Sequence, residues 1–354
     1  MKLYVSLSAT VFALFTANLA SAQGIFPLFP SVVSTVPSNG DVNPYGVAIV
    51  PKTLQAGGGI QSGDILVSNF NDSNNLQGRG TTIVRVTPAG NVSTFFTSQQ
   101  QGLTAALGVL SNGSVLIGNL PTADGTSATV SAGQLSVLDR FGDFLGTLGG
   151  GSINGPWGMA VDDLGSNGSG VAHVFLSNVL NGTILRFDIT YSPSFLQAGV
   201  ITLASGFNHR VDPAALVLGP SGMVYDAAHN RLLVASSYDN AVYQIANAAT
   251  ASAQQSAVYL FSSQTYLHGP LDIGLLPNGN ILVANSDGSN TDPNQPSELA
   301  EFTAAGAFVD QMPIDPNNGG AFGLAIKNFG WGTFQLAAVD DNTNTLHIWT
   351  SVIQ

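Results

Sequence analysis

Two His residues each stand a few positions ahead of an Asp in turn-rich segments. His209 precedes Asp212 in FNHRVDP, and His268 precedes Asp272 in LHGPLD. An imidazole that is oriented by a carboxylate can act as a general base in hydrolysis or elimination. If the protein is an enzyme, these two pairs are its predicted catalytic residues. A zinc centre would need more converging His residues than the two that lie in such turns.

A second set of polar residues recurs along the chain, each at the end of a short apolar run of the ILVSN type. These landmark residues, 48 to 59 positions apart, are Asn69, Asn119, Asn178, Ser237, Asn285 and Asp340. Their oxygens could bind a sugar or Ca²⁺. Asn and Asp at strand ends also commonly bond their own turn backbones, so both interpretations stand. The predicted ligand-binding residues are Asn69, Asn119, Asn178, Asn285 and Asp340.

The predicted metal ligands, should the protein bind Ca²⁺, are Asp239, Asp287 and Asp340. No other cofactor is predicted. The polar segment from Asn285 to Glu298 has the composition of a calcium loop but lacks the spacing of an EF-hand, which favours a solvated loop.

These residues must be positioned by β-strands, because apolar residues alternate with polar ones in many short runs. Examples are DILVSNF, TILRFDI and NILVANS, separated by turns that contain Asn-Gly. Six landmarks imply six units of four strands, a repeat that is typical of a β-propeller blade. We therefore predict an all-β, six-bladed propeller with antiparallel blades.

The two ends of the chain indicate how the ring closes. The sixth unit stops at Gln354 one strand short, and an unassigned strand, residues 30–37, precedes the first unit. We expect that strand to complete the last blade, which removes two open sheet edges. The predicted blades are approximately 43–98, 102–151, 153–207, 212–264, 267–315 and 319–354 plus 30–37.

The stretch GPWGMAV, residues 155–161, and its partial copies NPYGVAIV and GAFGLAIK are expected to form inner strands. Sheets converge near the axis, where only small side chains allow close approach. The aromatic residues of these stretches, Tyr45, Trp157 and Phe322, are predicted to cover the space between neighbouring blades. The turns that lead into inner strands and the turns that follow second strands should lie at the same end of the ring, which we call the mouth. Asn43, Ser237 and the candidate residues named above should lie at this mouth.

The recurring scheme of strand, Asn or Asp, turn and strand resembles the NHL-repeat propellers. It is seen in LSNVLNGTILRFD, ASSYDNAVYQI and AVDDNTNTLHIW. The resemblance implies a six-bladed ring with a ligand-facing mouth, in a family that ranges from binding modules to lyases. More distantly similar are the gluconolactonase-like propellers, which use a Glu in the first blade for a metal. The only Glu residues here, Glu298 and Glu301, come late in the chain.

Composition predicts the compartment. The chain begins with Lys2, an apolar run and the small residues Ala20 to Ala22, which predicts a signal peptide cleaved after Ala22 and a single secreted domain over residues 23–354. No later segment is apolar for long enough to span a membrane. The chain has no Cys, so its stability must come from packing. A net charge of −12 with nine scattered basic residues disfavours nucleic acid as a partner.

Two functions remain open from the sequence. The first is a monomeric binding module that presents its mouth to an extracellular carbohydrate, peptide or protein. The alternative is a metal-assisted hydrolase or lyase, lactonase-like, with its site at the same mouth. Convergence of carboxylates and His residues on one point would favour the enzyme, and dispersed side chains bonded to their own loops would favour the module.

Overall fold

The computed structural model describes residues 29–52, 54, 57–165, 169–192 and 195–352. The predicted signal peptide, residues 1–22, lies outside the described residues. Within the described part of the chain there is no α-helix, only strands and two short 3₁₀ turns, Ser127–Thr129 and Gly150–Ser152. None of the described helices is long and apolar enough to cross a membrane.

Six sheets have four antiparallel strands each. The first sheet consists of β2 (Val42–Ile49), β3 (Ile65–Asn71), β4 (Thr82–Val86) and β5 (Val92–Thr97). The second consists of β6 (Leu103–Val109), β7 (Val115–Asn119), β8 (Gln134–Leu138) and β9 (Phe144–Leu148). The third consists of β10 (Pro156–Asp163), β11 (Gly170–Asn178), β12 (Thr183–Ser192) and β13 (Phe195–Ala204).

The remaining three sheets follow the same plan. The fourth consists of β16 (Pro220–Asp226), β17 (Arg231–Ser236), β18 (Ala241–Ala246) and β19 (Ala257–Ser262). The fifth consists of β20 (Pro270–Leu275), β21 (Ile281–Asn285), β22 (Ser297–Phe302) and β23 (Phe308–Asp315). The last consists of β24 (Ala321–Gly330), β25 (Thr333–Asp340), β26 (Thr345–Val352) and β1 (Ser31–Ser34).

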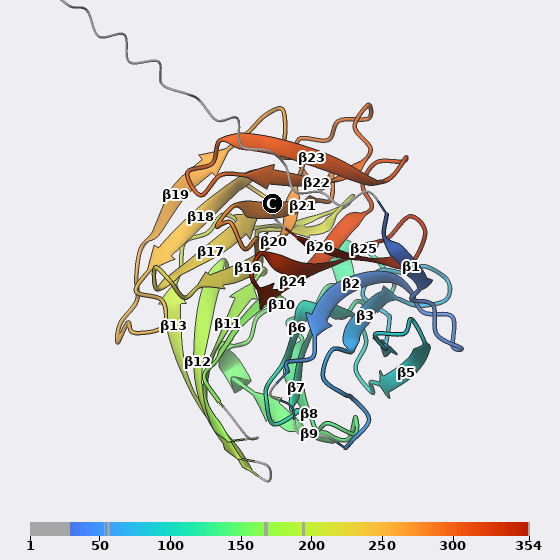
Figure 1. The fold of residues 1–354 in the computed structure, drawn as a ribbon, viewed down its shortest axis with the longest axis vertical. Coiled ribbons are helices and arrows are strands. Elements are labelled where there is room, and N and C mark those ends of the chain that lie inside the picture. The colour runs from blue at the N-terminus through green and yellow to red at the C-terminus, as the bar shows by residue number, and fades with distance from the viewer. Residues whose placement is uncertain (1–28, 53, 55–56, 166–168, 193–194, 353–354) are drawn as a thin grey trace, which may run out of the picture.

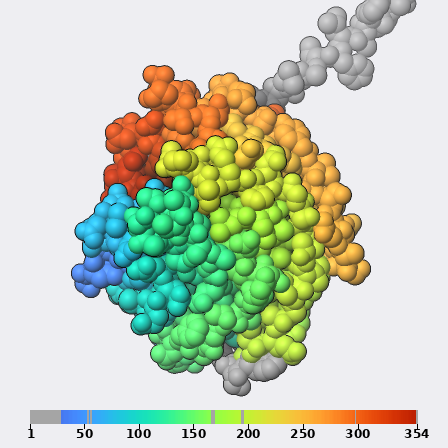
Figure 2. All heavy atoms as spheres, turned by 180° about the vertical axis from the view of Figure 1, so that it is seen from behind, coloured from blue at the N-terminus to red at the C-terminus, as the bar shows by residue number. Residues whose placement is uncertain are grey.

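The first strand of each sheet lies nearest the centre of the molecule (Figure 1). These inner strands contact one another in the cyclic order β2, β6, β10, β16, β20, β24 and back to β2. Seen from behind, the segments again follow one another around the rim in chain order (Figure 2). The arrangement is therefore a closed ring of sheets.

The chain ends close the ring as the sequence predicted. Strand β1 pairs with β26, from Ser31 opposite Ile348 to Ser34 opposite Thr345. Thr35 extends this contact, because its backbone N–H donates to the Asn344 carbonyl at 3.0 Å. The last sheet thus joins residues some 300 positions apart, and β1 covers the edge of β26 that would otherwise be unpaired.

Glycine in the inner strands permits close contact between neighbouring sheets. A Cβ atom on Gly158 would lie 2.2 Å from the carbonyl oxygen of Ser221, on the inner strand of the next sheet. In β20 the corresponding position holds Asp272 instead. Its carboxylate accepts the backbone N–H of Leu324 in the next sheet at 2.8 Å. In both cases, one inner strand contacts the next directly.

A seventh sheet has only two strands of three residues, β14 (Arg210–Asp212) and β15 (Leu216–Leu218). The sequence analysis placed residues 212–218 in the fourth blade, whereas the four-stranded sheet there begins at Pro220. The reason is that β14 and β15 pair with each other as a small hairpin, and not with β16. This hairpin precedes the fourth sheet as an insertion.

Candidate functional site

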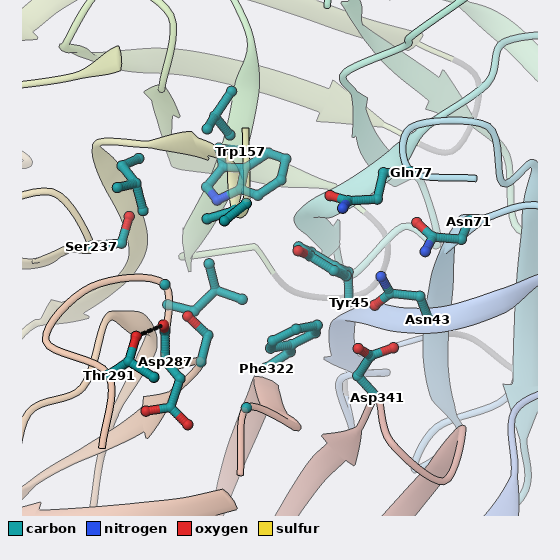
Figure 3. A pocket seen from close by; sticks show the side chains of 18 of the residues that line it. Asn43, Tyr45, Asn71, Gln77, Trp157, Ser237, Asp287, Thr291, Phe322 and Asp341 are labelled. Atoms are coloured by element: carbon teal, nitrogen blue, oxygen red, sulfur yellow. Dashed lines mark hydrogen bonds between the residues drawn. The ribbon is translucent and has the colours of Figure 1, made fainter. Parts of the chain in front are cut away.

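A cavity of about 370 Å³ opens where inner strands begin and second strands end, at the predicted mouth. Its lining combines the starts of the inner strands, the loops after the second strands and the β14–β15 hairpin. The lining residues are Asn43, Tyr45, Asn71, Asn75, Gln77, Trp157, Ala214, Ala215, Val217, Leu218, Ser237, Leu271, Ser286, Asp287, Gly288, Thr291, Gly319, Phe322 and Asp341. Most of these side chains are drawn in Figure 3.

Aromatic side chains from three sheets form the floor of this cavity. The ring centroid of Tyr45 lies 4.8 Å from that of Phe322, 5.3 Å from that of Trp157 and 4.8 Å from that of Phe70. All four rings are buried. The prediction that these aromatics cover the space between neighbouring blades is confirmed for Tyr45 and Phe322, which lie on adjacent inner strands. It is wrong for Trp157, which comes from the third sheet and meets Tyr45 of the first. The rings therefore converge on one point beneath the cavity.

Several buried polar atoms in the lining have no hydrogen-bond partner. They are Oδ1 of Asn43, Oδ1 of Asn71, Nε1 of Trp157 and both carboxylate oxygens of Asp287. The Asn71 amide is oriented by its other end, since Nδ2 donates to Oδ1 of Asn75 at 2.7 Å. An unsatisfied buried polar group costs about 1–3 kcal/mol, so native proteins contain few of them. Their concentration around one cavity is the most informative feature of this site.

Asp341 follows β25 and contributes a carboxylate to the lining. Burial raises its pKa to about 7, and the adjacent Asp340 carboxylate adds to the rise. In the close view its carboxylate lies beside Phe322 and Asn43 and points toward the opening (Figure 3). A carboxyl group with a pKa near 7 can exchange a proton at physiological pH, and such groups cluster at functional sites.

Asp287, after β21, is the second carboxylate of the lining. Burial raises its pKa, whereas the backbone N–H groups of Asp292 and Gly319 and the charge of His268 oppose that rise. These N–H groups influence the carboxylate without reaching hydrogen-bonding geometry, because both oxygens remain unpartnered. The loop is held from the other side, where the Thr291 hydroxyl donates to the Asp287 carbonyl at 2.8 Å (Figure 3).

The β14–β15 hairpin gives the cavity an apolar side. Ala214, Ala215, Val217 and Leu218 line it, and Leu271 of β20 adds to them. Val217 and Leu271 belong to the same buried cluster as the aromatic floor. The cavity is therefore amphipathic, with an apolar part from the insertion and floor and a polar part from the Asn residues and the two carboxylates.

The landmark residues lie at the ends of second strands, and their side chains bind backbone groups. Asn178 accepts the N–H of Asn154 at 2.9 Å and donates to the Ser152 carbonyl at 2.9 Å. Asn119 likewise accepts from Gln134 and donates to Gln101. Of the six landmark residues only Ser237 lines the cavity.

The other landmark residues behave in the same way. Asn69 donates to the carbonyl of Thr35, which helps to hold the closing strand. Asn285 accepts the N–H of His268 and donates to the Tyr266 carbonyl and to Glu298. Asp340 accepts from its own turn, at the Asn342 N–H. All five predicted ligand-binding residues thus bond to turns or loops, although Oδ1 of Asn69 is buried without a partner. None of the five lines the cavity.

Neither predicted His–Asp pair forms. The exposed His209 ring faces the carbonyl of Phe207, while Asp212 pairs with Arg210 and with its own turn. The buried His268 places Nδ1 2.7 Å from the Asn290 carbonyl oxygen and Nε2 3.1 Å from that of Thr265. Asp272 is occupied by backbone N–H groups, and burial raises its pKa to about 7.

The predicted metal ligands are dispersed. Asp239 accepts from Asn208 and Ser236, Asp340 accepts from its turn, and only Asp287 lines the cavity. Across the described residues no group of three or more His, Cys, Asp or Glu is placed to hold a metal ion. The donor set does not fit a metal of the gluconolactonase type, so no chemistry is derived through one.

Asp341, Asn71 and Gln77 were not singled out from the sequence. Asp341 directly follows the landmark Asp340, and its position one residue beyond the strand turns it toward the cavity. That position was the signal in the sequence that could have identified it. Trp157 was assigned a packing role from the sequence. The structure adds that Trp157 lines the cavity and that its Nε1 is buried without a partner.

Comparisons with known proteins address the fold. No protein-family model matches the chain, and no curated protein matches its sequence. A gluconolactonase from Xanthomonas campestris is similar in structure with a TM-score of 0.56 and 10% identity, over 94% of this chain and 99% of its own. A virginiamycin B lyase from Staphylococcus aureus has a TM-score of 0.50 and 12% identity, over 92% and 99%. At these identities the likeness shows the fold alone: the chain is an all-β propeller.

Proposed function

We propose that the protein is a binding module whose mouth cavity holds a small organic ligand. The observation that carries the proposal is the set of unpartnered buried atoms of Asn43, Asn71, Trp157 and Asp287 around one opening. A bound ligand that pairs with them would recover part of the free energy lost by their burial.

The size and polarity of the cavity support this function. A volume of about 370 Å³ falls within the range of small-molecule sites, about 300–1,000 Å³. Apolar surface from Val217, Leu218 and the aromatic floor lies opposite Asn and Asp side chains. This combination is typical of sites in which apolar contact supplies affinity and a few polar groups fix orientation.

We further propose that the ring has six blades and that the protein works outside the cytoplasm. Six four-stranded sheets and six inner strands in cyclic contact support the blade count, with the β14–β15 hairpin as an insertion and not a seventh blade. The predicted signal peptide supports the location. Recurrent turns of the NHL type support an NHL-like ring.

A thermal-shift screen of the mature protein against small sugars, amines and organic acids tests the binding function. Ligands of the cavity should raise Tm, because they bind only the folded state. The shift should shrink in Trp157→Phe, which loses the unpartnered N–H, and persist in the matched control Trp331→Phe, whose fully exposed side chain lies on the β24–β25 turn. No Tm shift from any compound, or equal shifts in both variants, would contradict a ligand site in this cavity.

Acid–base catalysis is the second candidate, and it is favoured by the pKa of Asp341, near 7 in a cavity of substrate size. Such a carboxyl could give up or take a proton from a bound substrate. An enzyme of this kind would lose turnover in Asp341→Asn while a substrate still binds. A binding module would show no turnover of any ligand found in the screen, measured by mass spectrometry of the recovered compound.

A further inference from the structure

The cavity described above also indicates the charge of its ligand. We infer that the ligand is a small organic ammonium compound, with its protonated nitrogen against Asp341 and its apolar part against the β14–β15 hairpin and the aromatic floor. The inference rests on the proposed binding function and adds the chemical class of the ligand.

The charge of the lining favours a cation. Asp287 and Asp341 are its only acidic side chains, and no Lys, Arg or His is among the described residues that line it. Two carboxylates within one partly buried cavity repel anions and attract cations, and the low local dielectric strengthens both effects. A carboxylate or phosphate ligand is thereby disfavoured.

The unpaired polar atoms of the lining residues favour a ligand that donates hydrogen bonds. The unpartnered lining atoms of Asn43, Asn71 and Asp287 are four acceptor oxygens, against one donor, Nε1 of Trp157. An ammonium group has three N–H donors and no acceptor, so it matches an acceptor-rich site. One hydroxyl or carbonyl oxygen elsewhere on the ligand would satisfy the Trp157 N–H.

The two carboxylates differ in how far the protein compensates their charge. Asp287 already faces two backbone N–H groups and the charge of His268, which also acts on Glu298. Asp341 faces no positive group, because its charged neighbour is Asp340. A ligand cation therefore gains more from Asp341, where it would neutralise a charge that the protein leaves uncompensated.

The surroundings of the nitrogen fit an organic ammonium better than a metal ion. Tyr45 and Phe322 form the aromatic floor, and Val217 and Leu218 line the apolar side. Metal ions of the Ca²⁺ type need about six to eight oxygen ligands. An alkyl or aryl ammonium instead buries its carbon skeleton against apolar surface and is further attracted to aromatic rings.

The pKa of Asp341 gives the expected pH dependence. Its carboxyl is neutral well below pH 7 and charged above, while an alkylamine stays protonated over this range. Affinity for an ammonium ligand should therefore rise from pH 5 to pH 8 and then level off. The groups that face Asp341, Asp340 and Tyr45, bring no positive charge that would reverse this direction.

Isothermal titration calorimetry with three probes of similar shape tests the inference. At pH 8 we expect 2-phenylethylammonium to bind at least tenfold more tightly than neutral 2-phenylethanol, and phenylacetate to bind weakest. Asp341→Asn should abolish the preference for the ammonium and leave the affinity for 2-phenylethanol unchanged. The matched control Asp143→Asn, an exposed carboxylate in the β8–β9 turn, should keep the preference.

Each other outcome separates the two proposals. If 2-phenylethanol binds as tightly as the ammonium, or if Asp341→Asn keeps the preference, the inference fails and the binding function stands. If all three probes are inert and the thermal-shift screen finds only neutral or anionic ligands, the inference also fails. The absence of any ligand in both experiments would overturn the binding function itself, as would equal Tm shifts in Trp157→Phe and Trp331→Phe.

Discussion

Two regions of the molecule contain the same amino acid types: the landmark residues at the ends of the second strands and the residues that line the mouth cavity. They differ in how their side chains are hydrogen-bonded. Asn178 is fully buried and bonded at both ends of its amide, to Asn154 and Ser152. Asn43, at the start of an inner strand of the same ring, is also buried, yet its Oδ1 has no partner. The first residue holds loops together, and the second lines a cavity with part of its amide unpaired.

This difference shows how a ring separates stability from function. Turn-forming Asn residues recur in every blade because each blade needs its loops fixed. Half of the buried unpartnered side-chain atoms among the described residues belong to residues that line the cavity, and Asp287 and Asp341 moreover have raised pKa values. Substitutions of landmark residues should therefore lower stability and leave ligand affinity unchanged. Substitutions of cavity residues should lower ligand affinity and cost little or no stability.

Gly158→Ala should have the largest effect, a loss of more than about 3 kcal/mol in unfolding free energy. The new Cβ would lie 2.2 Å from the Ser221 carbonyl oxygen and force two inner strands apart. Gly151→Ala, with no atom within 4 Å of its Cβ, is the control and should be close to neutral. Denaturant unfolding measures both, and equal stabilities would contradict the close-packed ring.

Asn178→Ala should cost about 1–3 kcal/mol, because it removes a fully buried amide and leaves the part-buried backbone groups of Asn154 and Ser152 without partners. Ligand affinity of the folded variant should stay as in the wild type. Asn91→Ala, in an exposed turn, is the control and should change neither property. A loss of affinity without a loss of stability in Asn178→Ala would reverse the assignment of the landmark residues.

Asp341→Asn should stabilise the protein by about 2 kcal/mol at pH 8, since one pKa unit corresponds to about 1.4 kcal/mol and solvent relaxation removes part of the effect. The folded-state pKa near 7 exceeds the unfolded value, so the wild-type carboxyl lowers stability as pH rises from about 4 to 7. At pH 4 the two proteins should be equally stable. Urea titrations at both pH values measure the unfolding free energies. A destabilised variant at pH 8 would contradict an unfavourable buried charge on Asp341.

Trp157→Phe should change the unfolding free energy least, by about 1 kcal/mol or less, because removal of an unpartnered N–H offsets the space left by the smaller ring. Affinity for a cavity ligand should nevertheless fall about fivefold, as expected for one lost hydrogen bond. Calorimetric titration of the variant measures the change. An unaltered affinity would show that the ligand does not reach the floor of the cavity.

Much of the fold could be predicted because its signals are local and repeated. Alternating apolar residues, Asn-containing turns and inner-strand glycines recur in each sheet, and the unmatched strand before residue 37 indicated closure with the last sheet. The boundary before Pro220 was missed, because nothing in the segment from Arg210 to Leu218 signals that it pairs with itself as a separate hairpin.

From the sequence, only the end of the ring at which the site lies could be predicted. Strand ends identify the mouth, but a shift of one residue decides whether a side chain turns into a loop or into the cavity, as Asp340 and Asp341 show. The His–Asp pairs failed because spacing along the chain does not reveal that His268 binds two loop carbonyls. Hydrogen-bond satisfaction depends on contacts between segments that are distant in sequence.

The most direct test of a ligand site in the mouth is the indole N–H spectrum of ¹⁵N-labelled protein during titration with 2-phenylethylammonium or a ligand found in the screen. The chain has three Trp residues, and Trp157→Phe identifies the signal of the cavity. Trp349 is an internal control, because its N–H is also buried and unpartnered but lies in the core of the last sheet. We predict that the Trp157 signal moves with ligand concentration while those of Trp349 and the exposed Trp331 stay in place. A Trp157 signal that does not move at saturation would contradict the account.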